Sequence, residues 1–75
     1  MHQDRNHVIL CTHRATYFET YLGSLPTQDG GHTPAMLKRP MIAKALRFCE
    51  AELDNILEVL SVQLGDTYAL MPVHL

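Results

Sequence analysis

Two pairs of side chains in this sequence have the types and the spacing of small chemical sites. His7 and Cys11 are four residues apart, and so are Glu50 and Asp54. On a helix this spacing places both members on one face, so His7 and Cys11 could form a thiolate–imidazole pair or share a metal ion, and the carboxyl groups could act as an acid–base pair. Each pair lacks a third group to orient it, and a structural zinc ion needs four ligands. We therefore expect no catalytic residue, no metal and no cofactor.

Two predicted helices would carry these residues. The first is expected over about residues 7–22, because apolar side chains recur there three and four residues apart and Gly23 supplies a stop signal. The apolar stripe of this helix consists of Val8, Cys11, Ala15, Phe18 and Leu22 and continues to Leu25. The second is expected from Pro40 to Leu64, with alternating spacings of four and three. The apolar positions of this long stripe are Ile42, Leu46, Cys49, Leu53, Ile56 and Leu60.

The remaining segments read as loops and ends of one small domain of 75 residues. Residues 1–5 are polar and are expected to fray. The glycine-rich stretch before Thr33 is a loop, and Thr33-Pro34 is typical of a helix start, so a short helical turn should precede a kink at Pro40. Residues 66–75 read as an extended C-terminal tail that must dock, and Pro72 makes a central strand improbable there.

The fold that follows is all-α: an antiparallel helix pair with one long C-terminal helix and an extended tail. An α+β fold is the alternative, with two short paired strands, Val8–Thr12 and Thr67–Met71, packed on the long helix. The first segment is rich in β-branched residues, which favours a strand. A hairpin after it would normally contain Asn-Gly or Asp-Gly, and Thr12–Arg14 contains neither. This absence favours the helix.

Composition narrows the class of protein. The apolar fraction of 47% is typical of a folded domain, and the net charge of -2 argues against a generic nucleic-acid binder, which usually carries a positive excess. No apolar run is long enough to span a membrane. We expect a cytoplasmic protein in which Cys11 and Cys49 are thiols facing the core; a disulfide between them is the alternative.

The predicted long helix has an unusual order of charges. Its first half is basic and its second half is acidic, which is the reverse of what the helix dipole favours. A homodimer could offset this arrangement, because an antiparallel pairing of two long helices brings each basic half against an acidic half. A different partner with a basic groove would serve equally well. A solvated helix face with no binding role is the alternative.

These features predict a small non-enzymatic protein-interaction module that regulates or inhibits a larger cytosolic assembly such as the transcription machinery. Small phage-encoded proteins that block host machinery share this general profile. The alternative is a small dimeric nucleic-acid-binding regulator that uses the basic half of the long helix. The predicted partner-binding residues combine two tyrosines with the two charged groups: Tyr17, Tyr21, Lys38, Arg39, Lys44, Arg47, Glu50, Asp54 and Glu58.

Overall fold

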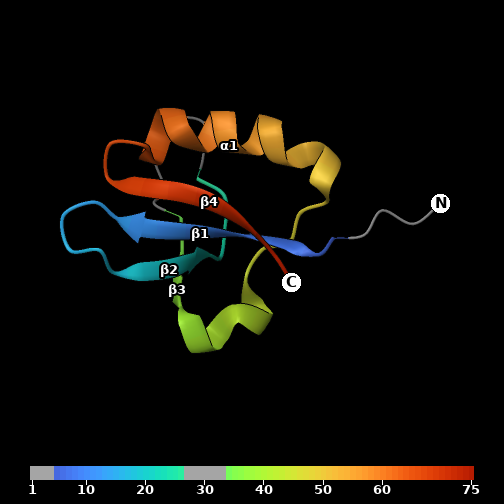
Figure 1. The fold of residues 1–75 in the computed structure, drawn as a ribbon, viewed down its shortest axis with the longest axis horizontal. Helices are drawn as coiled ribbons and strands as arrows, with labels where there is room; N and C mark the ends of the chain where they lie inside the picture. Colours follow the sequence, from blue (N-terminus) through green and yellow to red (C-terminus); the bar gives the residue numbers. More distant parts are fainter. Residues whose placement is uncertain (1–4, 27–33) are drawn as a thin grey trace.

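The computed structural model describes residues 5–26 and 34–75, and it places helices on both sides of an antiparallel sheet (Figure 1). The elements follow in the order β1 (His7–His13), β2 (Glu19–Leu22), β3 (Met36–Lys38), the 3-10 helix η1 (Arg39–Lys44), α1 (Glu50–Leu64) and β4 (Tyr68–His74). The strand order across the sheet is β3-β2-β1-β4. The predicted all-α helix pair is therefore wrong. The predictions for residues 1–4 and for the loop at 27–33 lie outside the described residues.

The sheet is buried on both faces at β1. Ile9 and Cys11 point to the α1 side and Val8 and Leu10 to the η1 side, so four consecutive residues are buried. Such a run is typical of a strand covered on both faces, whereas a two-helix fold leaves one side of each helix in water. The first core also contains Leu22, Phe48, Leu53, Leu60 and Leu64, and the second contains Tyr21 and Ala45. The apolar stripes predicted for the two helices contain only some of these buried residues.

The first and last strands pair along their full lengths. The register runs from His7 opposite His74 to His13 opposite Tyr68. The α+β alternative had placed two strands in these same regions, and the structure adds β2 and β3 beyond β1. β4 is an edge strand with Pro72 opposite Ile9. His7 exchanges backbone hydrogen bonds with Phe48 on the side of β1 that faces away from β4. Backbone N–H and C=O groups alternate between the two sides of a strand, so those of Ile9 also point away from β4, and Ile9 and Pro72 form a non-hydrogen-bonded pair. The nitrogen of Pro72 therefore faces the free edge of the sheet, where proline is tolerated.

His13 explains how β1 turns into β2 without Asn-Gly or Asp-Gly. Its ring nitrogen Nδ1 accepts hydrogen bonds from the backbone N–H groups of Ala15 and Thr16, at 3.2 and 3.4 Å. The backbone N–H of Tyr17 donates to the His13 carbonyl, and Tyr17 adopts a left-handed backbone with φ of 60°. A histidine side chain thus takes the role that Asn or Asp usually has in a turn.

The predicted long helix is interrupted well after Pro40. The structure has the short helix η1, then an extended segment, and α1 begins only at Glu50. The extended segment is tied to the sheet, because the N–H of Leu46 donates to the Leu22 carbonyl at 3.0 Å and the N–H of Phe48 donates to the His7 carbonyl at 2.8 Å. The predicted apolar stripe is therefore shared between the two cores. No helix among the described residues is long and apolar enough to cross a membrane.

Acidic side chains favour the start of α1. Glu50 and Glu52 lie in its first turn, where the helix dipole stabilises negative charge, so the reversed charge order expected for the long helix is not present. The Cys49 N–H donates to Glu52 Oε1 at 2.9 Å, which completes a capping box, and Arg5 lies 2.8 Å from the same oxygen. The hydrogen bond from Cys49 is the main cause that holds the pKa of Glu52 below its ordinary value.

Arg14 connects the β1–β2 turn to the end of α1. Its Nε donates to the Gly65 carbonyl at 2.7 Å, which satisfies one of the last carbonyls of the helix with a positive charge. The N–H of Gly65 donates to the Ser61 carbonyl, and a side chain at Gly65 would meet that same oxygen. The chain then passes directly into β4, so most of the predicted tail is a strand.

Candidate functional site

The predicted partner-binding residues are divided among four regions. Tyr17 lies in the β1–β2 turn and is 78% exposed, whereas Tyr21 lies on β2 and is only 6% exposed. Tyr21 packs in the core between the sheet and η1. Of the two tyrosines predicted to bind a partner, only Tyr17 is therefore exposed. The charged residues are all exposed, in two groups: Lys38, Arg39, Lys44 and Arg47 precede α1, and Glu50, Asp54 and Glu58 lie on it.

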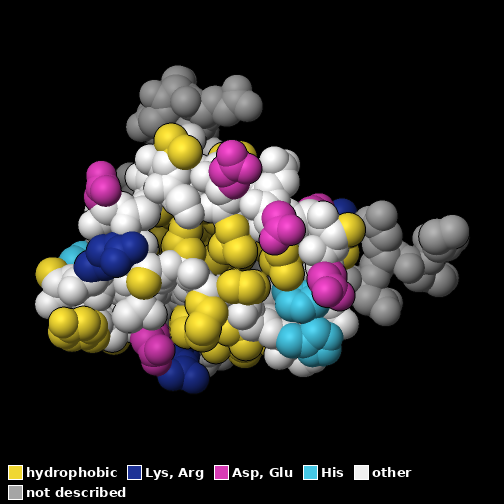
Figure 2. Space-filling view, turned by 45° about the horizontal axis from the view of Figure 1, so that its top comes forward, with side chains coloured by type: hydrophobic (Ala, Val, Ile, Leu, Met, Phe, Trp, Pro, Cys, Tyr) yellow, Lys and Arg dark blue, Asp and Glu magenta, His cyan; other side chains and the backbone are white. Residues whose placement is uncertain are grey.

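The two charge groups lie on different elements. The segment from Pro34 to Cys49 contains four basic residues and no acidic residue, and α1 contains four acidic residues and no basic residue. Figure 1 places η1 and α1 on opposite sides of the sheet, and Figure 2 shows acidic side chains spaced along the helix. The predicted basic half of the long helix does not exist. A two-fold pairing of α1 with its own copy would place acidic groups against acidic groups, so the charge argument for a homodimer is lost.

The β1–β2 turn exposes two consecutive aromatic rings. Tyr17 is held in the left-handed region, which costs a residue with a Cβ about 1–2 kcal/mol, and Phe18 is 59% exposed. The N–H of Phe18 donates to Thr16 Oγ1 at 3.3 Å, and the Phe18 carbonyl accepts from His13, so the backbone of the turn is fixed. Strained backbone and exposed aromatic rings often coincide at binding sites. This turn is the part of the described chain that we take as the candidate site.

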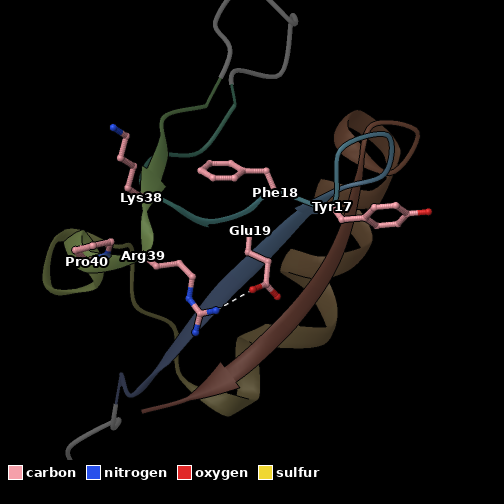
Figure 3. Close-up of a pocket in the computed structure, with 6 residues that line it drawn as sticks. All are labelled: Tyr17, Phe18, Glu19, Lys38, Arg39 and Pro40. Atoms are coloured by element: carbon pink, nitrogen blue, oxygen red, sulfur yellow. Dashed lines mark hydrogen bonds and ion pairs between the residues drawn. The ribbon is translucent and has the colours of Figure 1, made fainter.

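A recess of about 400 Å³ lies between this turn and the start of η1. Its lining residues come from the turn, β2, β3 and η1: Tyr17, Phe18, Glu19, Lys38, Arg39 and Pro40. Figure 3 shows the Phe18 ring directed toward Lys38 and β3, whereas Tyr17 points away on the other side of the turn. We call this set of six residues the aromatic–basic recess. It brings together three of the predicted partner-binding residues, namely Tyr17, Lys38 and Arg39.

Strand pairing fixes the position of the charged groups in the recess. Thr20 pairs with Lys38 at the end of the β2–β3 ladder, so Glu19 and Arg39 are the next residues beyond that last pair. Arg39 Nη1 donates to Glu19 Oε1 at 2.8 Å. Lys38 is exposed, and Figure 3 draws its side chain directed away from this ion pair. The recess therefore offers an aromatic face, one cation and one cation–anion pair.

Sequence reasoning missed three of the lining residues, namely Phe18, Glu19 and Pro40. Phe18 had been placed on the apolar stripe of a helix and therefore in the core. A strand interpretation of β1 would have moved Phe18 into the following turn, where an aromatic residue is exposed. Four consecutive apolar residues, from Val8 to Cys11, could have indicated the strand from the sequence.

The structure separates the residues proposed for thiol chemistry. His7 and Cys11 are four residues apart on a strand, not on a helix, so about 13 Å separates their Cα atoms. His7 instead contacts the ring of His74, with centroids 4.7 Å apart. Burial raises the pKa of the Cys11 thiol to about 11, so this sulfur is protonated at neutral pH and is a poor nucleophile.

The other candidate chemical sites also lack supporting geometry. Glu50 and Asp54 are exposed on α1. Within residues 5–26 and 34–75, no three side chains of His, Cys, Asp or Glu are grouped to hold a metal ion. Cys11 and Cys49 are both buried thiols and are not joined by a disulfide.

No protein-family model matches this chain, and neither a curated protein nor a solved structure matches it. The function of the chain must therefore be inferred from its own residues.

Proposed function

We propose that this chain binds single-stranded nucleic acid through the aromatic–basic recess. The observation that carries the proposal is the Phe18 ring, which is exposed beside Lys38 and Arg39. Proteins that bind single strands commonly stack bases on aromatic rings and hold the backbone phosphates with basic side chains. The proposal keeps the nucleic-acid alternative from the sequence and moves it from the long helix to the recess.

The segregation of charge supports this proposal. On one helix, the acidic residues would have repelled phosphates from the basic ones. In this fold the four basic residues of the Pro34–Cys49 segment precede α1, and four acidic residues lie on α1, which the sheet separates from η1. A strand bound at the recess would meet Lys38, and Arg39 paired with Glu19, before it met the acidic residues of α1. The net charge of -2 makes nonspecific binding to duplex phosphates weak, so stacking must supply much of the affinity.

Replacing Phe18 by alanine should weaken binding to a labelled 12-nucleotide oligothymidine by about 5- to 150-fold, because a base–aromatic stack contributes about 1–3 kcal/mol. Fluorescence anisotropy at low salt measures the dissociation constant. Phe18→Tyr should retain most of the affinity, since it keeps a ring. Asn55→Ala, on the exposed side of α1, is the matched control. Equal affinities for the wild type and Phe18→Ala would refute the proposal.

A protein-interaction role is the second candidate, and a specific surface favours it. Val62 is 83% exposed on α1, and Val59, one turn earlier, is also exposed. Glu58 lies one turn before Val62 on the same helix, and Asp54 lies one turn before Glu58. Figure 2 shows hydrophobic side chains also gathered below α1. Such a surface would suit a partner with an apolar groove and basic rim, as expected for a regulator or inhibitor of a larger assembly.

Val62→Lys should reduce binding to such a partner by at least about tenfold, because it places a charge in an apolar contact. The measurement is affinity capture from a lysate of the source cells with tagged wild-type protein, followed by titration of the captured protein. Ala43→Lys adds the same charge on η1, on the other side of the sheet, and should leave capture unchanged. Identical capture by Val62→Lys and the wild type would exclude this surface.

A further inference from the structure

The ion pair between Glu19 and Arg39 lies inside the aromatic–basic recess. Glu19 is the first residue of β2 and Arg39 is the first residue of η1, and both lie immediately beyond the last β2–β3 pair, Thr20 and Lys38. Arg39 Nη1 lies 2.8 Å from Glu19 Oε1, and the side chains are 61% and 38% exposed, respectively. Both residues line the recess together with Phe18 and Lys38, and Figure 3 draws the pair as a dashed line.

The position of this carboxylate matters because a guanidinium binds carboxylate and phosphate oxygens with the same geometry. A carboxylate held on Arg39 therefore takes the place that a backbone phosphate would take. It also lowers the formal charge of the recess, since Lys38 and Arg39 supply two positive charges and Glu19 supplies one negative charge. While Glu19 is paired with Arg39, Lys38 is the recess cation outside this ion pair.

We infer that Glu19 is a specificity-determining residue that competes with nucleic-acid phosphates for Arg39. A bound strand must displace the carboxylate before Arg39 can hold a phosphate. The recess then selects ligands that bring a base for Phe18 as well as a phosphate, and it discriminates against ligands that offer phosphates alone. This inference rests on the proposed binding of single strands at the same recess.

A purely structural ion pair is the competing explanation. Exposed ion pairs of this kind contribute little to folding stability, because water screens the charges and the long side chains lose freedom. The antiparallel β2–β3 ladder already fixes the two backbones. A structural role would leave the affinity for nucleic acid unchanged when the pair is removed, so the two explanations make different predictions.

Glu19→Gln should tighten binding of a labelled 12-nucleotide oligothymidine by about two- to fivefold at low salt, because Arg39 becomes available to a phosphate. One added phosphate contact should also steepen the dependence of log affinity on log salt by about 0.7. Fluorescence anisotropy over a salt series measures both quantities. Circular dichroism checks that each variant is folded.

The same substitution in an Arg39→Gln background separates competition from general repulsion. If Glu19 acts by blocking Arg39, then Glu19→Gln should have no effect once Arg39 is removed. An equal gain in both backgrounds, or no gain with Arg39 present, would overturn the inference. If the wild type binds the probe and Glu19→Gln does not bind it more tightly, the inference fails and the proposed function stands. If neither protein binds the probe, both fail.

Discussion

Replacing Ile9 by alanine should lower the free energy of unfolding by about 2–5 kcal/mol, the usual cost of removing a buried aliphatic side chain. Ile9 is fully buried in the core between β1 and α1. A chain of 75 residues typically has a total stability of about 4–11 kcal/mol, so this variant should be marginally folded. Urea unfolding followed by circular dichroism gives the free-energy change.

The matched control is Phe18→Ala, which should change the free energy of unfolding by about 0.5 kcal/mol or less because the ring is mostly exposed. The predicted helix pair would reverse this order, since Phe18 lay on its apolar stripe and Ile9 did not. A Phe18→Ala variant less stable than Ile9→Ala would therefore contradict the sheet. A stable Phe18→Ala protein also makes the binding test interpretable.

Replacing Tyr21 by alanine should cost about 3–5 kcal/mol, the range seen when a buried aromatic side chain is removed. Tyr21 packs with Val8, Leu10 and Ala45 on the η1 side of the sheet, so its loss opens a cavity in the second core. The melting temperature measured by calorimetry should fall by more than 10 °C for a domain of this size, at about 4–8 °C per kcal/mol.

Tyr17→Ala is the control for this result, because it removes the same ring from an exposed position, and alanine keeps the Cβ that the left-handed backbone strains. We expect Tyr17→Ala to have a melting temperature close to that of the wild type. A Tyr21→Ala protein that melts with the wild type would show that η1 does not cover a second core. Because Tyr21 is buried in the second core, a loss of nucleic-acid binding in Tyr21→Ala would indicate unfolding of the protein and not the loss of a direct contact with the nucleic acid.

Some features of the fold could be predicted from the sequence because they depend on local chemistry. The end of α1 at Gly65 and the exclusion of Pro72 from a central strand both held. The sequence could not decide whether the first element is a helix or a strand. Val8, Cys11 and Leu22 have the spacing of a helical apolar stripe, and the same three residues are buried in the sheet. The partners that decide the question, α1 and η1, lie far along the chain.

The candidate site could be predicted only in part, for a similar reason. Lys38 and Arg39 are among the predicted partner-binding residues because charged side chains usually lie at the surface, and the structure exposes both. The pairing of Glu19 with Arg39 depends on the register of β2 and β3, which no local pattern specifies. The turn at His13 was missed because a histidine side chain replaces the usual Asn or Asp.

The position of Pro72 on the edge strand has a consequence for aggregation. An exposed edge strand offers unpaired N–H and C=O groups to any other chain with a similar strand, which is a common first step toward amyloid. Here the edge position opposite Ile9 has no N–H to offer, because proline occupies it. A second molecule adding to β4 would therefore lose a hydrogen bond in the middle of the new ladder. Pro72 thus disfavours the pairing of β4 with a strand of a second molecule.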